Sequence, residues 1–471
     1  MSIQTSIQTH NPATGAIVET FMPFTQEQIQ SILEQARQTF FHWRETTFVR
    51  RTAYLHAVAS RLRDQKERLA RLAVLEMGKP INEAEAEIEK CAWNCDFYAD
   101  NAARFLADEV TPTNATESYV AFNPLGVVLA LMPWNFPYWQ VFRFAAPALM
   151  AGNTAVLKHA SNVSRVALEI ERLFVESGLP QGVFRTVLVP GSETGALISD
   201  PRIAAVTLTG SEAVGVEVAS ASGRALKKHV LELGGSDAFI VLADADIDAA
   251  AQVAVQARFQ NNGQSCIAAK RFIIVESVYD AFLQKFVDLT AQLRVGDPLS
   301  RETQIGPLAR ADLLETLEQQ VQASVALGAR VVLGGKRLPG NGYYYAPTIL
   351  ADVTPEMPVF REETFGPAAA VIRARDTEHA VELANDSTFG LGGNLWTRDI
   401  QRARQLARHL ESGSVFINGM TASDPRLPFG GIKHSGYGRE LSYFGIREFV
   451  NIQTVWIGPR IDGATATVTS E

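Results

Sequence analysis

The feature that most limits the fold of this chain is an uninterrupted apolar segment, Gly-Val-Val-Leu-Ala-Leu-Met at 126–132, followed at once by a proline. A strand that is apolar at every position is buried on both faces, which is typical of a parallel sheet covered by helices. Further buried strands are predicted at 155–158 and 205–209, with helices ending near 151 and covering 164–177. This alternation of strands and helices predicts a doubly wound α/β sheet.

A second α/β unit is predicted to begin near residue 233, where the alternation restarts. Before residue 110 the apolar spacing predicts helices instead, the first capped at Thr25. Short strands are expected near both 118–122 and 448–456, the second at a sheet edge. The strands expected in the second unit are 238–242, 271–275, 330–333 and 368–372, with a helix at 247–258.

Charge and cysteine content narrow the class of protein. The 471 residues carry a net charge of −8, which argues against general affinity for nucleic acid or an anionic membrane. Only three cysteines are present, which favours a reducing compartment over a disulfide framework. Residues 1–12 have no apolar core of a signal peptide, and no apolar run is long enough to span a bilayer. A soluble cytoplasmic protein is the expectation.

Two patterns on the helix expected at 81–106 have simple structural interpretations. The charges at Glu83, Glu85, Glu87, Glu89 and Lys90 are interpreted as a solvated face.

Cys91 and Cys95 lie four residues apart, hence on one face of that same helix. They are interpreted as packing residues because no nearby His or Cys completes a metal-ligand set. No metal site is predicted.

The reactive candidates are a cysteine and a glutamate. Cys266 follows the polar, glycine-containing turn 259–265, where backbone N–H groups can point at a bound oxygen. Glu232 lies between two leucines, an apolar setting that raises a carboxyl pKa and makes it a usable base near neutrality. Taken alone, a cysteine can be a small buried apolar residue and a Gly-Gly pair can be only a turn. The hypothesis therefore depends on the other motifs of the chain.

The expected nucleotide motif has an unusual form. No G-x-G-x-x-G sequence follows any predicted strand, so the usual dinucleotide fingerprint is absent. Instead, Gly210 and Ser211 join a strand to a helix. Ser211 and the helix N-terminus can hold a phosphate, and Ser211 can equally be a simple N-cap.

Six motifs, taken in order, resemble those of the aldehyde dehydrogenase superfamily, and the resemblance covers nearly the whole chain. The residues Lys158-His159-Ala160 and 416–419 are similar to the succinate-semialdehyde dehydrogenase branch. The six motifs are Met132–Pro137, Gly210–Ser211, Glu232–Gly235, Gly263–Cys266, Glu362–Pro367 and Pro428–Gly431.

The resemblance implies a chemistry that suits these residues. Cys266 adds to an aldehyde as a thiolate, and the side-chain amide of Asn135 and the N–H of Cys266 stabilise the oxyanion. Hydride leaves for a nicotinamide cofactor, which yields a thioester on Cys266. Glu232 then activates the water that hydrolyses this thioester. These three residues are the predicted catalytic set.

Cofactor contacts are likewise implied by the resemblance. Lys158 is expected at the adenosine ribose and Glu363 at the nicotinamide ribose. Ser161 stands where NAD-selective relatives often carry a glutamate, so NADP is expected to be accepted and slightly favoured over NAD. The remaining expected cofactor-binding residues are Trp134, Gly210, Ser211, Leu233 and Phe365.

The expected substrate is a small aldehyde with a distal carboxylate, most simply succinic semialdehyde. Arg143 lies eight residues after Asn135, on about the same helix face, and by the resemblance it anchors that carboxylate, with Ser423 as a second donor. One departure is Gln260, where some such enzymes carry a second arginine. The alternatives are an uncharged aldehyde substrate, or a non-catalytic structural or binding protein on the same fold.

The resemblance also implies a division into domains. Residues 1–106 and 124–232 would form an NAD(P)-binding domain, and 233–445 an α/β catalytic domain. A small β extension, 107–123 and 446–458, would pair with another subunit in a homodimer or homotetramer. The tail, 459–471, is expected to be loose.

Overall fold

The apolar segment after Gly126 forms strand β5 (Val127–Met132), and all six residues of this strand are buried. The computed structural model describes residues 6–459. Strand β5 lies inside a six-stranded sheet with the order β19-β9-β8-β5-β6-β7, in which the pairs among β9, β8, β5, β6 and β7 are parallel. The other strands are β6 (Thr154–His159), β7 (Phe184–Thr186), β8 (Ile203–Thr209), β9 (Lys228–Glu232) and β19 (Gly436–Tyr437).

The order of these strands is that of a doubly wound dinucleotide-binding sheet. From β5 the chain moves outward through β6 and β7, then crosses back to place β8 and β9 on the other side of β5. The crevice at the carboxyl ends of β5 and β8 is where such sheets bind ligands. The connecting helices are α5 (Trp139–Met150), α6 (Ser164–Glu176), α7 (Thr194–Ser199) and α8 (Glu212–Arg224), with short 3-10 turns η1 (Ser161–Val163) and η2 (Gly191–Glu193).

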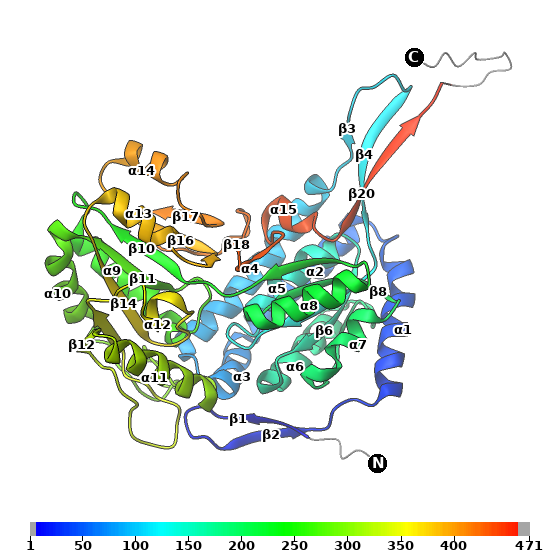
Figure 1. Ribbon diagram of the computed structural model, residues 1–471. Helices are drawn as coiled ribbons and strands as arrows, with labels where there is room; N and C mark the ends of the chain where they lie inside the picture. The colour runs from blue at the N-terminus through cyan, green and yellow to red at the C-terminus, as the bar shows by residue number, and fades with distance from the viewer. Residues whose placement is uncertain (1–5, 460–471) are drawn as a thin grey trace.

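A second sheet of seven strands forms the other half of the molecule (Figure 1). Its order is β12-β13-β14-β11-β10-β16-β17, and only the β12–β13 pair is antiparallel. The strands are β10 (Asp237–Val241), β11 (Ala269–Val275), β12 (Arg330–Leu333), β13 (Thr348–Ala351), β14 (Ala368–Ala374), β16 (Gly392–Trp396) and β17 (Ser414–Ile417). Its helices are α9 (Ile247–Phe259), α10 (Tyr279–Thr290), α11 (Ala311–Ala326), α12 (Pro358–Arg361), α13 (Thr377–Asn385) and α14 (Ile400–Leu406), with 3-10 turns η3 (Gln260–Gly263) and η4 (Glu276–Val278). The mixed α/β class predicted from the sequence is confirmed.

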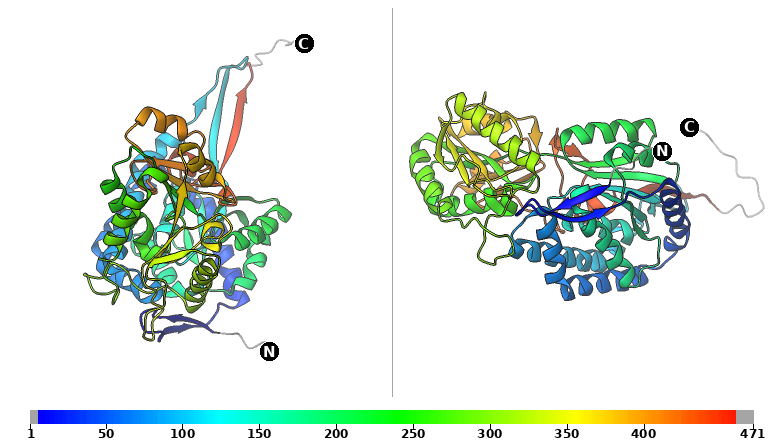
Figure 2. Two further views of the ribbon diagram at one scale, coloured as in Figure 1. Left: turned by 60° about the vertical axis from the view of Figure 1, so that its left-hand side comes forward. Right: turned by 90° about the horizontal axis from the view of Figure 1, so that it is seen from below.

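The N-terminal region is helical, as its apolar spacing indicates. Helix α1 begins with a capping box, because Thr25 and Gln28 bond each other's backbone N–H groups. The four helices are α1 (Gln26–Trp43), α2 (Phe48–Asp64), α3 (Lys66–Met77) and α4 (Ile81–Phe105). The sequence did not predict the hairpin before them, β1 (Ile7–His10) and β2 (Ile17–Phe21), which Figure 2 shows beneath the helices.

A three-stranded antiparallel sheet projects away from both halves (Figure 1). It contains β3 (Glu109–Val110), β4 (Glu117–Pro124) and β20 (Val450–Ile457), and β20 is an edge strand. The remaining elements are α15 (Ser442–Ile446) and the short pair β15 (Phe389–Gly390) and β18 (Ile432–Lys433). The division into domains remains a prediction. Of the predicted loose tail, only Pro459 falls within the described residues.

Helix α4 differs from its sequence interpretation in the role of its charges. Glu87 is buried, pairs with Lys79, and accepts hydrogen bonds at 2.8 Å from the N–H groups of Tyr138 and Trp139, which begin α5. The interpretation of this charge run as a solvated face is therefore wrong for Glu87, and it is also wrong for Glu83 and Lys90, which bond to the Asn261 N–H and to the Ser423 hydroxyl. Glu85 does face outward, where it pairs with Arg301.

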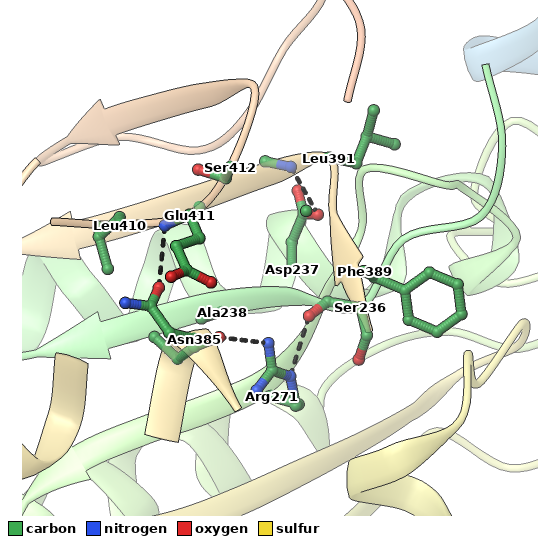
Figure 3. Close-up of a pocket in the computed structure, with 14 residues that line it drawn as sticks. Ser236, Asp237, Ala238, Arg271, Asn385, Phe389, Leu391, Leu410, Glu411 and Ser412 are labelled. Carbon is green, nitrogen blue, oxygen red and sulfur yellow. Dashed lines mark hydrogen bonds between the residues drawn. The ribbon is translucent and has the colours of Figure 1, made fainter. Parts of the chain in front are cut away.

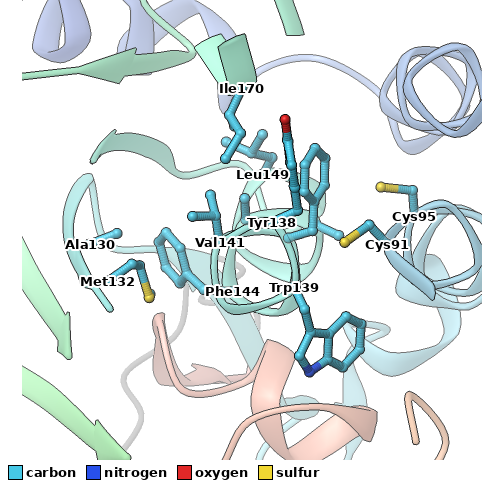
Figure 4. Packing of buried hydrophobic residues seen from close by; sticks show 14 of the residues in the cluster. Cys91, Cys95, Ala130, Met132, Tyr138, Trp139, Val141, Phe144, Leu149 and Ile170 are labelled. Carbon is cyan, nitrogen blue, oxygen red and sulfur yellow. The ribbon is translucent and has the colours of Figure 1, made fainter. Parts of the chain in front are cut away.

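The two cysteines of α4 are fully buried in the largest apolar cluster, beside Tyr138 and Trp139 of the α5 region (Figure 4). Within residues 6–459 no group of side chains has the composition of a metal site. Nor does any helix in that part of the chain have the length and apolarity needed to cross a membrane.

Candidate active site

Cys266 lies at the junction of the two halves, on a loop held in an uncommon conformation. The loop leaves α9 and passes through Asn261 and Asn262, whose φ angles of 54° and 59° lie in the left-handed region. This backbone conformation is unfavourable for a residue with a side chain, and side-chain hydrogen bonds offset its energetic cost. Asn262 donates to the carbonyls of Gly78 and Pro307 and accepts from the N–H of Gly306. The loop is thereby fixed before the chain reaches the cysteine.

Glu232 lies directly beside the cysteine. Strand β9 ends at Glu232, and its Oε2 is 3.9 Å from the Sγ of Cys266. Glu232 is 1% exposed, and burial raises the pKa of its carboxyl to about 7. A carboxylate with that pKa exchanges protons readily near neutral pH, as a general base must. The structure thus brings together two residues that lie 34 positions apart.

Arg143, on α5, is held by two carboxylates. Its Nη2 donates to the Oε2 of Glu232 and to the Oγ1 of Thr209, each at 3.3 Å, and its Nε lies 2.5 Å from the Oε2 of Glu440. Its guanidinium also lies 4.6 Å from the centre of the Phe429 ring. The Arg143 guanidinium is therefore paired with Glu232, the glutamate beside Cys266. The position of Arg143 in the sequence did not predict this ion pair.

The charged groups around Cys266 shift the pKa of its thiol in opposite directions. Burial raises the pKa of the thiol well above its ordinary value, and the Glu232 carboxylate raises it further. The cations Arg143 and Lys270 act the other way. Lys270 is fully buried, and its ammonium donates at 2.8 Å to the carbonyl of Cys266 itself. The thiol is thus protonated at rest and needs a neighbouring base to become a nucleophile.

Asn135 follows β5 and faces the same loop. Its Nδ2 donates at 3.1 Å to the carbonyl of Gln264, and its own carbonyl accepts from the Nδ2 of Asn261. Its side-chain oxygen is buried without a partner in the described part of the chain. The amide is therefore held by the Cys266 loop, and its role as an oxyanion donor stays a prediction.

A cavity of about 560 Å³ opens beside Cys266 and has the size of a small-molecule site. Arg143, Ser423 and Gln260, named from the sequence as substrate-related, all lie on its wall. A second hollow of about 390 Å³ shares four of its lining residues with this cavity. The four shared residues are Gln252, Val255, Leu293 and Gln304.

One cavity residue was not anticipated. Lys90 of α4 reaches the cavity wall, donates at 2.7 Å to the Oγ of Ser423, and lies 4.4 Å from the centre of the Trp139 ring. The helical spacing of Glu83, Glu87 and Lys90 places them on one face, the face that meets α5 and the Cys266 loop. That spacing is the signal that could have identified Lys90.

The expected cofactor residues lie at the carboxyl edge of the first sheet. Lys158 is at the end of β6, Ser161 begins η1 just after it, and Gly210 and Ser211 follow β8. Ser211 is the N-cap of α8, yet its hydroxyl makes no capping hydrogen bond. The hydroxyl and the first N–H groups of α8 are thus available to a phosphate, so these residues fit a dinucleotide.

The other expected cofactor residues line the seam between the two halves. Glu363 accepts a hydrogen bond at 3.0 Å from the N–H of Gly235 and lies 3.4 Å from the Nζ of Lys270. Trp134 and Phe365 meet edge to face with their ring centres 5.7 Å apart. Leu233 bonds through its N–H to the carbonyl of Ser435. Residues from β5, β9 and the second half therefore meet within one region.

A different hollow, between β10 and β16, carries no comparable chemistry (Figure 3). Its volume is about 20 Å³, room for roughly one water molecule. Arg271 in its wall donates to the backbone carbonyls of Ser236, Leu383 and Ala384. Its polar groups hold strands and loops together, and it does not compete as the substrate site.

Comparisons with known proteins agree with this geometry. The model of the aldehyde dehydrogenase family matches residues 1–455. A Synechocystis protein named as a probable NADP+ succinate-semialdehyde dehydrogenase is 53% identical over 452 residues, covering 96% of this chain and 100% of that protein. A Mycobacterium ulcerans protein named NADP+ succinate-semialdehyde dehydrogenase 1 is 51% identical over 456 residues, with 96% and 100% coverage. The crystal structure of succinic semialdehyde dehydrogenase from Streptococcus pyogenes in complex with NADP+ superposes with a TM-score of 0.94 at 38% identity, covering 96% of this chain and 100% of that one.

Proposed function

This chain belongs to the aldehyde dehydrogenase family, and we propose that it oxidises succinic semialdehyde to succinate with NADP+, NAD+ being the second cofactor. The single observation that carries the chemistry is the Cys266–Glu232 pair, 3.9 Å apart, with Cys266 on the wall of the 560 Å³ cavity. A thiol and a base at that distance suit covalent catalysis on a carbonyl. The cofactor supplies a hydride acceptor when it is bound.

The chain's own residues divide the work as follows. Glu232 takes the thiol proton through its Oε2, and Cys266 adds to the aldehyde carbon. Asn135 and the N–H of Cys266 stabilise the oxyanion that forms. Once the acyl group is a thioester on Cys266 and Glu232 has released the thiol proton to solvent, Glu232 removes a proton from the water that hydrolyses the thioester. One base thus serves two steps, which its pKa near 7 permits.

Binding residues are proposed from the same geometry. Lys158, Ser161, Gly210 and Ser211 hold the adenosine and phosphate end of the cofactor, at the edge where β6 and β8 end. The residues proposed for the nicotinamide end are Trp134, Leu233, Glu363 and Phe365. For the substrate, the proposed residues are Arg143 and Ser423, both on the cavity wall.

The projecting sheet supports a proposal about assembly. Strand β20 is an edge strand that exposes Ile452, Trp456 and Ile457, and an exposed apolar edge favours pairing with another chain. We propose that this sheet pairs with a second copy in a homodimer or homotetramer. We also propose that the enzyme works in the cytoplasm, because its three cysteines are buried and unpaired.

The test is cofactor reduction by the purified protein with succinic semialdehyde, butanal and benzaldehyde, each with NADP+ and NAD+. We expect the highest kcat/KM with succinic semialdehyde and NADP+. Equal efficiency with butanal would favour an enzyme for uncharged aldehydes. Absence of turnover with every aldehyde, in protein that binds NADP+, would favour a non-catalytic role. The relatives' names do not favour either alternative.

A further inference from the structure

The cavity beside Cys266 contains two cations in different states. Arg143 is engaged by the Glu232 and Glu440 carboxylates. Lys90 donates only to the neutral hydroxyl of Ser423 and, among residues 6–459, forms no ion pair. Lys90 is therefore the cation of this cavity wall that has no ion-pair partner among the described residues.

The acidic residues near Lys90 bond to other groups. Glu87 pairs with Lys79 and accepts from the first N–H groups of α5. Asp424, which follows Ser423, pairs with Arg426 at 2.6 Å. The Glu83 carboxylate accepts from the N–H of Asn261. An anion that enters the cavity therefore meets no competing carboxylate already bound to Lys90.

We propose that Lys90, together with Ser423, binds the distal carboxylate of the aldehyde substrate and makes this enzyme selective for carboxylate-bearing aldehydes. The proposal rests on the function proposed above and assigns its specificity to a residue that the sequence analysis did not single out. Lys90 takes over the role that a second arginine would have at position 260, where this chain has Gln260 on the same cavity wall.

The surroundings of Lys90 suit that role. The Trp139 ring, 4.4 Å from the ammonium, restricts its position and leaves the Ser423 hydroxyl beside it as a second donor. Burial, followed by the positive charge of Arg143, lowers the pKa of Lys90 to about 8. A bound carboxylate favours the charged ammonium and so offsets part of the free energy lost by burying that charge. The ion pair is also stronger because the site is desolvated.

The test compares Lys90→Gln with the wild-type enzyme on two aldehydes of similar length, succinic semialdehyde and butanal. We expect KM for succinic semialdehyde to rise about 10- to 100-fold, the worth of a hydrogen bond to a charged group, while KM for butanal stays within a factor of about two. Lys90→Arg keeps the charge and should retain most of the preference. Lys285→Gln, an exposed lysine of α10 paired with Asp248, is the matched control for loss of one positive charge.

Direct binding gives a second readout. Titration with succinate should show about a 10-fold or larger loss of affinity in Lys90→Gln and little change in Lys285→Gln. An unchanged KM for succinic semialdehyde, or equal KM increases for both aldehydes, would overturn the assignment of Lys90. Turnover of butanal by the same samples shows whether the proposed dehydrogenase function holds, so the two failures are distinguishable.

Discussion

Arg143 and Glu232 form an ion pair beside the candidate nucleophile, with the Nη2 of the arginine 3.3 Å from the Oε2 of the glutamate. The same carboxylate oxygen faces the Sγ of Cys266. Arg143 thus influences the protonation of the proposed base directly. Its cation opposes the burial that raises the pKa of Glu232. Glu440, on the other side of Arg143, keeps this guanidinium in place.

The first prediction concerns the pH dependence of activity. Glu232 acts as a base only when deprotonated, and its pKa is about 7. We expect kcat/KM to fall about ten-fold per pH unit below that value and to level off above it. Arg143→Gln removes the cation that favours the carboxylate, so this limb should move to higher pH, whereas Arg143→Lys should move it less. If the acidic limb of the pH profile stays in place in Arg143→Gln, Arg143 does not influence the pKa of Glu232.

A second prediction uses the same arginine to separate its two possible roles. If Arg143 also holds substrate, Arg143→Ala raises KM for succinic semialdehyde far more than for butanal. If it acts only through Glu232, kcat falls for both aldehydes by a similar factor and the KM ratio is unchanged. Steady-state kinetics with both substrates, at a pH well above 7, decides between the two.

The third prediction concerns Cys266 and Glu232, the two groups proposed to react. Cys266→Ala should lower kcat by about a thousand-fold or more while NADP+ binding, measured by titration, stays near wild type, since the sulfur forms the covalent bond. Glu232→Gln should lower kcat by about 10²- to 10⁴-fold and show a burst of reduced cofactor where hydrolysis becomes slow. Substantial turnover by Cys266→Ala would remove the nucleophile assignment.

The fourth prediction concerns cofactor choice. Ser161 is exposed at the start of η1, three residues beyond Lys158. A carboxylate there would repel a 2′-phosphate and accept from the ribose hydroxyls. Ser161→Glu should therefore lower kcat/KM for NADP+ about 10-fold or more and raise it for NAD+. The uncharged variant Ser161→Ala serves as the control, and equal effects of Ser161→Glu on both cofactors would argue against placing Ser161 at the 2′-phosphate.

The fifth prediction concerns oxidation. Position 268, two residues after the nucleophile, is an alanine, and Cys91 and Cys95 are buried on α4. Peroxide should inactivate the enzyme by oxidising Cys266 itself or by forming a cofactor adduct. Peptide mass spectrometry of the inactivated protein should show modified Cys266. A disulfide from Cys266 to Cys91 or Cys95 that accompanies inactivation would refute this.

Much of the fold could be predicted from local patterns. The fully apolar strand at 127–132, the helices from 25 to 106 and the edge strand near 448–456 follow from periodicity and capping, which act within a few residues. Strand β16 was missed because Gly-Gly-Asn-Leu-Trp has little strand propensity, and parallel pairing with β10 imposes its conformation. The β1–β2 hairpin was missed for want of a strong alternating pattern.

The sequence by itself determined the family, and it predicted both the cysteine and the glutamate that we propose as reactive and the position of Arg143 on a helix after Asn135. Only the tertiary structure decided which groups lie next to the charged side chains of the site. Periodicity tells which residues share a face of α4 or α5, but the partner of that face comes from chain segments hundreds of residues away, such as Ser423 for Lys90 and Glu440 for Arg143. Burial and charge pairing arise from those contacts, so the helical spacing that places Lys90 on the face of Glu83 and Glu87 does not by itself show that this face is buried.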